Sequence, residues 1–186
     1  MSTPHLHDRA VAFMAFLQRY AADRGALANL RGALSDARRH RAWPLLGGFP
    51  GAIGNPAFET VAALWAGDPA GDRPNAGNLG DTLHSLAKEN KSFEGRVKRL
   101  LTCDRDEIAE RVAPLVRAAR AKGVKVNYAR LLSDLLWWND RVQVEWAKAF
   151  WGVGEPADAI ALGMLDPPVA DSADPASASP AKEAHA

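Results

Sequence analysis

The sequence predicts an all-α fold of about eight helices in two packed bundles, followed by a disordered C-terminal tail. Apolar residues recur at steps of three and four along most of the chain before Gly152, and no segment of useful length alternates as a strand would. Four of the six tryptophans lie in one band at 127–152, which offers the other helices a large apolar surface. After Gly152 the composition changes to Ala, Pro, Asp and Ser, which cannot bury enough apolar surface to fold.

The first three helices are predicted at the N-terminal end of the chain. The helix at 7–20 is amphipathic, and the helix at 26–40 turns its leucines inward and leaves Arg31 at the edge of the buried face. Residues 43–56 are predicted to form a packed loop, because glycines and prolines alternate with large apolar residues that need burial. A short third helix follows at 57–66.

A polar connection at 67–77, rich in turn-forming residues, is expected to be exposed and to separate the two bundles. The predicted organisation is an N-terminal helical bundle at 1–66, this connection, a C-terminal helical bundle at 78–153 and an Ala/Pro/Asp-rich tail at 154–186. Asn78 is positioned to cap the first helix of the C-terminal bundle, whose leucines share one face.

The segment 92–103 is the most amphipathic in the chain, and its apolar pattern ends at Cys103, which we expect to be a core or cap thiol. Asp104 and Glu107 then form an aspartate-headed capping box, which predicts the start of the next helix. Pro114 lies inside that helix. It predicts a kink in the preceding turn, because proline removes one backbone hydrogen bond.

The tryptophan-rich band has helix signals at both ends and an interruption in the middle. Asn127 is positioned as its N-cap and Gly152 as its C-terminal stop. Asn139 and Asp140 either lie within one continuous helix or mark a break between two helices. We favour a break, with Asp140 as the N-cap of the last helix.

Helical spacing assigns the aromatic residues of this band to the core or to the surface. Trp138, Trp146 and Phe150 are expected to be mostly buried, which leaves only Trp137 or Trp151 at the surface. Aromatic residues stack on bases in many single-strand binders. Here the spacing instead predicts a structural support for the basic segment that precedes the band.

The net charge of +1 hides two regions of opposite sign. Residues 1–153 hold 22 Lys/Arg against 16 Asp/Glu, whereas residues 154–186 hold one lysine against six acids. Within the first region, residues 88–130 hold 12 basic and six acidic side chains, so this segment carries the excess. A surplus of this kind can attract a polyanion, although a solvated helix face of mixed charge is the alternative.

The sequence contains no motif that would indicate catalysis or a cofactor. It has no HExxH, GxSxG or GxxxxGK motif, and its single cysteine excludes an internal disulfide and a multi-cysteine zinc site. No apolar run approaches the roughly 20 residues that span a bilayer, and the N-terminus lacks a signal-peptide pattern. We therefore expect a cytoplasmic binding protein that is not an enzyme and has no membrane contact, metal or cofactor.

Four segments occur in a distinctive order: LANLRGAL, NLGDTLHSLA, FEGRVKRLLTCDRDEI and GVKVNYARLLSDLLWWNDRVQVEWAKAFWG. Together they resemble the CasB family, the small subunit of the type I-E CRISPR Cascade complex. The resemblance covers roughly residues 8–152 and is strongest from residue 92 onward. The chain departs from the family at Gly32, where an arginine often follows the one matched by Arg31. It also departs at Pro114, in a helix usually free of proline, and in the tail, which has no counterpart.

The resemblance implies a non-enzymatic, all-helical subunit that stabilises the R-loop in antiviral defence. The implied partners are the backbone and large subunits of Cascade, the guide RNA, the target double-stranded DNA including its displaced strand, and a second copy of the chain. Because base pairing reads the sequence in such complexes, the protein is expected to contact phosphates. The family's motifs assign these contacts to Arg31, Arg96, Lys98, Arg99, Arg105, Arg130 and Arg141. The alternatives are a solvated charge or an internal salt bridge for each residue, and a purely structural interaction subunit for the chain.

Overall fold

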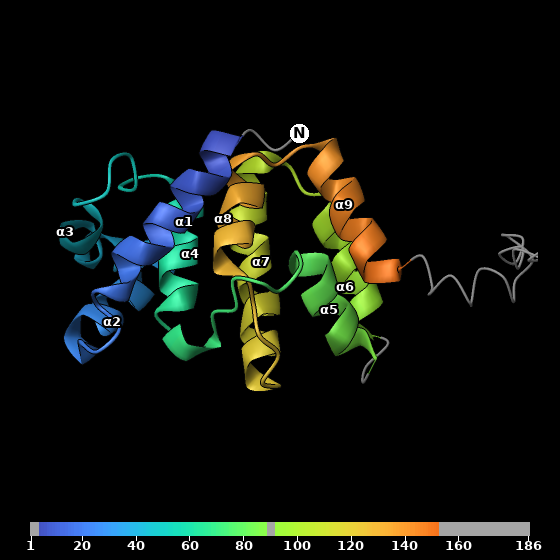
Figure 1. Cartoon of the computed structure of the whole chain (residues 1–186), viewed down its shortest axis with the longest axis horizontal. Coiled ribbons are helices and arrows are strands. Elements are labelled where there is room, and N and C mark those ends of the chain that lie inside the picture. Colours follow the sequence, from blue (N-terminus) through green and yellow to red (C-terminus); the bar gives the residue numbers. More distant parts are fainter. Residues whose placement is uncertain (1–3, 89–91, 153–186) are drawn as a thin grey trace, which may run out of the picture. The chain divides into compact units, whose positions relative to one another are not determined.

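The structure, a computed structural model, describes residues 4–88 and 92–152 (Figure 1). Within those ranges the regular structure consists of nine α-helices, three short 3-10 helices and one isolated bridge between Asp72 and Val126. The all-α prediction is confirmed, with one helix more than the eight expected. The predicted disordered tail at 154–186 lies outside the described residues.

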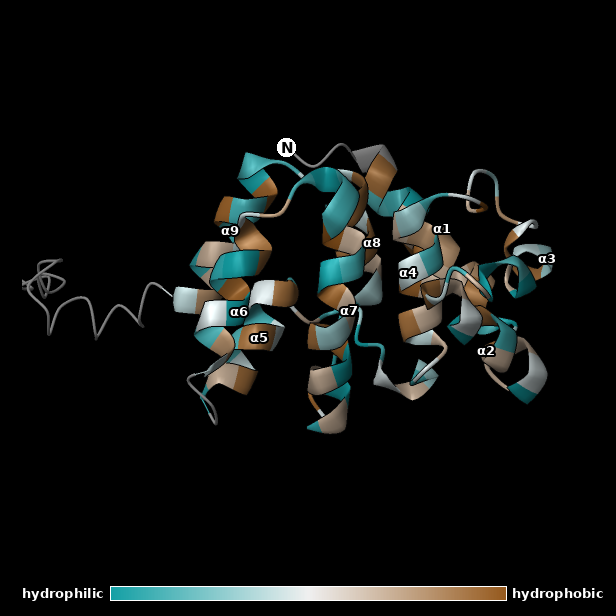
Figure 2. Cartoon of the chain, turned by 180° about the vertical axis from the view of Figure 1, so that it is seen from behind, coloured by the Kyte–Doolittle hydropathy of each residue, from teal (hydrophilic) through white to brown (hydrophobic). Residues whose placement is uncertain are grey.

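The described residues belong to one compact unit that ends at Gly152. Its α-helices are α1 (Pro4–Gln18), α2 (Arg24–Arg31), α3 (Trp43–Leu46), α4 (Pro56–Trp65), α5 (Leu79–Ala87), α6 (Ser92–Leu101), α7 (Arg105–Ala121), α8 (Tyr128–Leu136) and α9 (Asp140–Trp151). The 3-10 helices are η1 (Gly32–Leu34), η2 (Arg39–Arg41) and η3 (Pro69–Gly71). Figure 2 shows both hydrophobic and hydrophilic residues around the helices, as expected for helices that bury one side. No helix of the described part is long and apolar enough to cross a membrane.

Helix α2 is shorter than the predicted helix at 26–40. It begins after Asp23, whose carboxylate accepts backbone hydrogen bonds at 2.8 and 3.0 Å, and it gives way to η1 at Gly32. The chain then turns back through an extended Ser35, so that a Cβ on Gly32 would lie 3.2 Å from the carbonyl oxygen of Arg38. The prediction of one continuous helix was wrong, because this close approach is a tertiary contact that apolar periodicity does not reveal.

Helix α4 is the most deeply buried helix of the N-terminal part. Asn55 caps it, and every residue after Pro56 is buried. It packs against α2, α7 and α8. The preceding segment, predicted as a packed loop, contains the short helix α3 and buries Leu46 and Ala52 completely. These elements place the N-terminal part against the helices that carry the basic residues.

The connection at 67–77 is tied to the segment before α8. The Arg73 amide donates to the Val126 carbonyl at 2.9 Å. The Asn127 side chain donates to the carbonyls of Pro74 and Ala76 at 2.7 and 2.8 Å. Helix α1 also packs on α8, so helices from before and after the connection share contacts. The boundary between two bundles at this connection stays a prediction.

Two predicted capping interactions are confirmed, whereas a third predicted helix start is confirmed without its capping hydrogen bonds. Asn78 and Asp81 form a capping box at α5, and the Asn127 side chain accepts from the Arg130 amide at 2.8 Å at the start of α8. Asp104 occupies the N-cap position of α7, but its side chain makes no capping hydrogen bond. Instead, Glu107 pairs with Arg111 one turn further along the helix.

Pro114 lies within α7, which is assigned as helix without interruption from Arg105 to Ala121. The proline side chain is exposed, and the helix continues for seven residues beyond it. Proline therefore does not end this helix, and the kink before it stays a prediction.

The break in the tryptophan-rich band is confirmed, but its cap lies one residue earlier than predicted. Helix α8 ends at Leu136, and the Asn139 side chain accepts from the first amides of α9 at 3.0 and 3.2 Å. Asp140 is therefore the first helical residue and not the N-cap. Both residue types are good N-caps, so their order alone could not decide between them. Gly152, with φ of 60°, ends α9 as expected.

The aromatic residues of the band lie where the helical spacing predicts. Trp138, Trp146 and Phe150 are buried, whereas Trp137 and Trp151 are exposed. The rings of Trp138 and Trp146 pack edge to face at 4.9 Å. Helix α9 packs mainly on α5 and also contacts α6, so the band supports the helix that carries the predicted basic site.

Candidate nucleic-acid interface

Helix α6 presents a basic surface because its apolar residues lie on one side. Phe93, Val97 and Leu100 follow at steps of four and three and are buried. Arg96 and Arg99 lie beside this stripe and are exposed. The burial of the apolar stripe thus fixes the direction in which the two guanidinium groups project.

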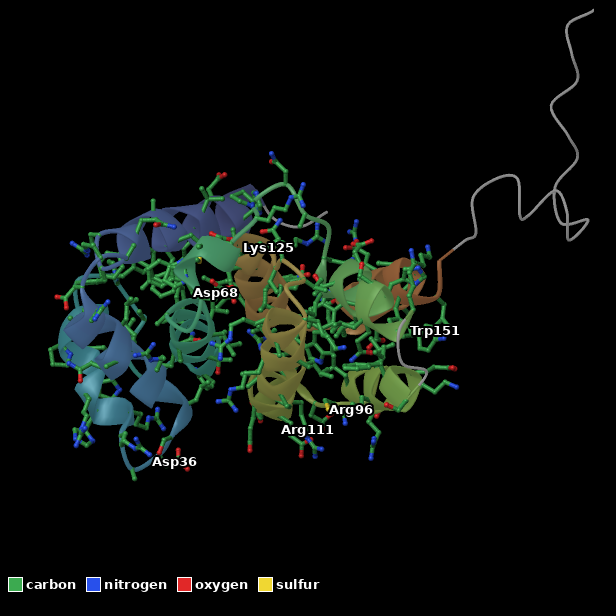
Figure 3. The ribbon with its side chains drawn as sticks, turned by 90° about the horizontal axis from the view of Figure 1, so that it is seen from below. Asp36, Asp68, Arg96, Arg111, Lys125 and Trp151 are labelled. Atoms are coloured by element: carbon green, nitrogen blue, oxygen red, sulfur yellow. The ribbon has the colours of Figure 1, made fainter. Side chains whose placement is uncertain are left out.

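A groove of about 230 Å³ lies between α6 and α7. It is lined by Arg96, Arg99, Leu100, Arg111, Pro114 and Leu115. Figure 3 shows Arg96 and Arg111 close together at the same edge of the molecule, one from α6 and the other from α7. The groove therefore combines three guanidinium groups with an apolar floor.

The internal contacts of these three arginines are weak. The guanidinium of Arg96 lies 5.2 Å from the centre of the Phe93 ring, and Nε of Arg99 donates to the Gly95 carbonyl at 3.2 Å. Arg111 pairs with Glu107 at 3.4 Å, and both side chains are more than half exposed. Exposed pairs of this kind contribute about 0–1 kcal/mol, so an incoming anion can compete for all three arginines.

Lys98 and Arg105 lie outside the groove. Lys98 pairs with Glu94 at 2.7 Å, one turn away on α6, and both side chains are exposed. Arg105 donates to the Leu136 carbonyl at 2.8 Å and so binds one of the last carbonyls of α8. Each has one internal partner and remains exposed to solvent.

Arg130 and Arg141 belong to a polar network between α8 and α9. Arg130 donates to Asp134 at 2.8 Å and to Glu145 at 2.6 Å, and its side chain is only 32% exposed. Arg141 binds the other oxygen of Glu145 at 3.3 Å. Asp134, 2% exposed, also accepts a hydrogen bond from Trp146 at 2.7 Å. The network joins the two helices through side chains that are distant in sequence.

Burial and charge act in opposite directions on the pKa values within this network. Burial raises the pKa of Asp134 above its usual value, and hydrogen bonds from Trp146 and Arg130 offset only part of that effect. Burial lowers the pKa of Arg130, but the charges of Asp134 and Glu145 outweigh it, so that the pKa is raised overall. Arg130 is thus held as a structural cation.

Arg31 is exposed at the end of α2, and Figure 1 shows α2 and α6 at opposite ends of the helical assembly. Of the seven predicted residues, the structure therefore places two, Arg96 and Arg99, in the groove between α6 and α7. It adds Arg111, which sequence reasoning did not assign. The cations of α7 are spread around that helix, and only its packing against α6 selects Arg111.

The basic groove has a limited extent. An adjoining groove of about 470 Å³ between η1 and α7 is of mixed charge, because Glu107 and Glu110 line it together with Arg111 and Arg117. Beyond it, a recess of about 270 Å³ contains four carboxylates and one arginine, namely Asp36, Glu59, Asp106, Glu110 and Arg39. The surface near α7 thus changes from basic beside α6 to mainly acidic beside α4.

The thiol of Cys103 and the potential metal ligands are the remaining groups of chemical interest in the part of the chain that the structure describes. Cys103 is buried, its thiol donates to the Arg99 carbonyl at 3.2 Å, and burial raises its pKa, which disfavours the nucleophilic thiolate. Among the described residues, no group of three or more His, Cys, Asp or Glu side chains is placed to hold a metal ion.

Comparisons with known proteins agree on one family. The family model for CRISPR-associated protein Cse2 matches residues 26–151. A CRISPR-associated protein Cse2 from Thermus thermophilus is 37% identical over 101 residues, which are 53% of this chain and 57% of that relative. The match thus spans little more than half of the relative's length.

Solved structures share the fold over most of their length. A Cse2-family protein from Thermus thermophilus has a TM-score of 0.63 and 31% identity, covering 77% of this chain and 98% of that one. For M. ruber CasB the TM-score is 0.64 and the identity 28%, and the match covers 82% of this chain and 97% of the M. ruber chain. A chain of a CRISPR RNA-guided surveillance complex, 23% identical, has a TM-score of 0.68, with 84% and 99% covered. Since the family model covers well over half of the sequence, the chain belongs to the CRISPR-associated Cse2 family, also called CasB.

Proposed function

We propose that this chain is the non-catalytic small subunit of a type I-E CRISPR RNA-guided surveillance complex, Cascade. In this role it binds the sugar-phosphate backbone of the guide RNA and target DNA, and the displaced strand, and so stabilises the R-loop. Its partners are the backbone and large subunits, the guide RNA, the target duplex and a second copy of the chain. Family membership supports the assignment to Cascade, and the geometry of α6 and α7 supports the contact with nucleic acid.

The observation that carries this proposal is the convergence of Arg96, Arg99 and Arg111 on one groove. A guanidinium group presents two parallel N–H donors that match two phosphate oxygens, and it stays charged at all relevant pH values. Weak internal contacts leave these donors available. Phosphate contacts carry no sequence information, which suits a complex in which base pairing reads the target.

The other predicted residues contribute unequally to this proposal. Lys98 and Arg105 are exposed and can add phosphate contacts beside the groove, and Arg31 can contact a separate part of the nucleic acid. Arg130 and Arg141 are assigned a smaller part, because each would have to leave a carboxylate to reach a phosphate. The mainly acidic recess beside α4 marks the end of the basic surface.

A purely structural subunit is the second candidate, favoured by exposed apolar residues on α9 and directly after α8. Trp137, Val144 and Trp151 are each more than 40% exposed. Exposed large apolar residues are typical of surfaces that contact proteins. In this case the exposed arginines and lysines would contact only water. Loss of their charge would then impair neither nucleic-acid binding nor R-loop lifetime.

Charge reversal distinguishes the two candidates. The test variant carries Arg96→Glu, Lys98→Glu and Arg99→Glu. The control carries Arg24→Glu, Arg73→Glu and Lys88→Glu, three exposed cations outside the groove. Both variants change the net charge equally. R-loop lifetime is measured in the reconstituted complex, incorporation is followed by pull-down with the other subunits, and helix content by circular dichroism.

We expect the test variant to assemble but to shorten the R-loop lifetime by about tenfold or more, because a tenfold change needs only about 1.4 kcal/mol. The control should stay within about twofold. Equal lifetimes for the test variant and the unmodified protein would contradict the proposal. Failure of the test variant to assemble, with normal helix content, would favour the structural candidate.

A further inference from the structure

Trp151 is held in place and yet exposed. It is the last residue of α9, and 44% of its surface is accessible to solvent. Its ring packs edge to face on Phe150 at 5.0 Å, and its side chain lies beside the carboxylate of Glu94 of α6. Glu94 also pairs with Lys98 at 2.7 Å. Contacts from both helices thus fix the orientation of an indole that is nearly half exposed.

The way in which Trp151 is held determines what it can offer a ligand. The indole N–H is its only polar group, and the Glu94 carboxylate beside it is the natural acceptor for that hydrogen. What remains is the aromatic surface. Lys98 lies beside it through the shared carboxylate, and Lys148, three residues earlier on α9, is exposed on a neighbouring position of the helix. An aromatic surface beside lysines matches the chemistry of single-strand binding, in which bases stack on rings and cations hold the backbone.

We propose that Trp151 stacks on an unpaired base of a single-stranded nucleic acid whose backbone crosses α6. This inference rests on the proposed function and assigns it a further residue and a strand type. A helix with its side chains is about 10–12 Å across, a width that a few nucleotides of an extended single strand can cross. One strand can therefore place phosphates on Arg96 and Arg99 and a base on Trp151. A base inside a duplex has no free face, so the contact selects single strands.

Val144 provides the matched control, because it distinguishes base stacking from protein docking. It lies seven residues before Trp151, on the same side of α9, and is 50% exposed. A protein partner that docks on this side would use both residues as apolar contacts. A base that stacks on the indole would use only Trp151. The neighbouring lysines, Lys98 and Lys148, favour the nucleic acid.

The experiment measures binding of the full chain to a single-stranded DNA oligonucleotide and to a duplex of equal length, over a series of salt concentrations. The variants are Trp151→Ala, Trp151→Phe and Val144→Ala, with helix content checked by circular dichroism. Trp151→Ala should weaken single-strand binding about tenfold, within the about 1–3 kcal/mol measured per stacked base. Its salt slope should not change, because stacking releases no counterions. Trp151→Phe should keep most of the affinity, and Val144→Ala all of it.

Three outcomes would overturn the stacking inference: an unchanged single-strand affinity in Trp151→Ala, an equal loss on the duplex, or an equal loss in Val144→Ala. A failure of complex assembly in both Trp151→Ala and Val144→Ala, with single-strand affinity intact, would assign this side of α9 to a protein partner. Failure of the proposed function would give a different result from failure of stacking. If the proposed function were wrong, the variant with Arg96, Lys98 and Arg99 reversed to Glu would show the same slope of log affinity against log salt as the unmodified protein. Failure of stacking alone would leave that variant with a shallower slope.

Discussion

The groove between α6 and α7 and the network between α8 and α9 use the same residue type in opposite ways. In the groove, Arg96 and Arg111 are exposed and make only weak internal contacts. In the network, Arg130 is held by two carboxylates, one of them buried. An arginine opposite a buried acid is a structural element, whereas an arginine opposite solvent is available to a ligand. The difference depends on packing between helices and not on the charge of the segment.

The largest expected effect lies in the network. Arg130→Ala leaves the buried carboxylate of Asp134 without its cation, which should lower the free energy of unfolding by about 2–3 kcal/mol. Urea denaturation measures this loss. The matched variant Arg96→Ala should change stability by less than about 0.5 kcal/mol, because it removes an exposed side chain whose contact with the Phe93 ring is weak. Nucleic-acid affinity per folded molecule should fall in Arg96→Ala and not in Arg130→Ala. If affinity fell in Arg130→Ala and not in Arg96→Ala, the distinction between the groove and the network would be wrong.

The pH dependence of stability sharpens the account of Asp134. Since its pKa is raised in the folded protein from the usual 3.8, the folded state holds a proton at pH values where the unfolded state has lost it. The contribution of this group to the unfolding free energy therefore declines as pH rises from 3.8 through the folded pKa. Its slope cannot exceed about 1.4 kcal/mol per pH unit for one proton.

Asp134→Asn removes this titration, and urea unfolding of both proteins over the acidic range measures the difference. Relative to Asp134→Asn, the unmodified protein should lose stability as pH rises above 3.8. A relative gain over the same range would show that ion pairing outweighs burial, and the account of this group would be wrong.

The cap of α9 predicts an effect of intermediate size. Asn139→Ala removes the side chain that accepts two first-turn amides, so we expect a loss of about 1 kcal/mol in the free energy of unfolding. Asp140→Ala removes only an acidic residue in the first turn and should cost less. Thermal or urea unfolding compares the two variants. If Asp140→Ala lost more unfolding free energy than Asn139→Ala, Asp140 would be the N-cap of α9, as the sequence predicted.

The smallest effect is expected at the exposed edge of the network. Arg141 pairs with Glu145 at 3.3 Å, and its side chain is 62% exposed. Arg141→Ala should therefore cost no more than about 0.5 kcal/mol, and added salt should reduce the cost further. Urea denaturation at low and high salt tests this. A loss as large as that of Arg130→Ala would place Arg141 in the buried part of the network.

Local signals predicted most of the fold, and tertiary contacts account for the errors. Asn78, Asn127 and Gly152 act within one turn of their own helices, so the sequence identifies them directly. The close approach of Gly32 and Arg38 joins residues across a turn that no periodicity encodes. The sequence therefore predicted α2 as too long.

The candidate site shows the same division. Amphipathic spacing on α6 was enough to place Arg96 and Arg99 at the surface, because burial of the apolar stripe fixes both. Arg111 enters the groove only through the packing of α7 on α6. Likewise, Arg130 is withdrawn from the surface by Glu145, which lies 15 residues away on another helix. Helical spacing alone contains neither fact.

Salt dependence tests most directly whether the groove and the network differ in function. Single-stranded DNA binding is measured for Arg96→Ala/Arg99→Ala/Arg111→Ala and for Arg130→Ala/Arg141→Ala, under conditions where circular dichroism shows both to be folded. Each phosphate contact on a single strand contributes about 0.7 to the slope of log affinity against log salt. The groove variant should lose about 2 from the magnitude of that slope and the network variant almost nothing. An unchanged slope in the groove variant, or an equal loss in both, would contradict the account.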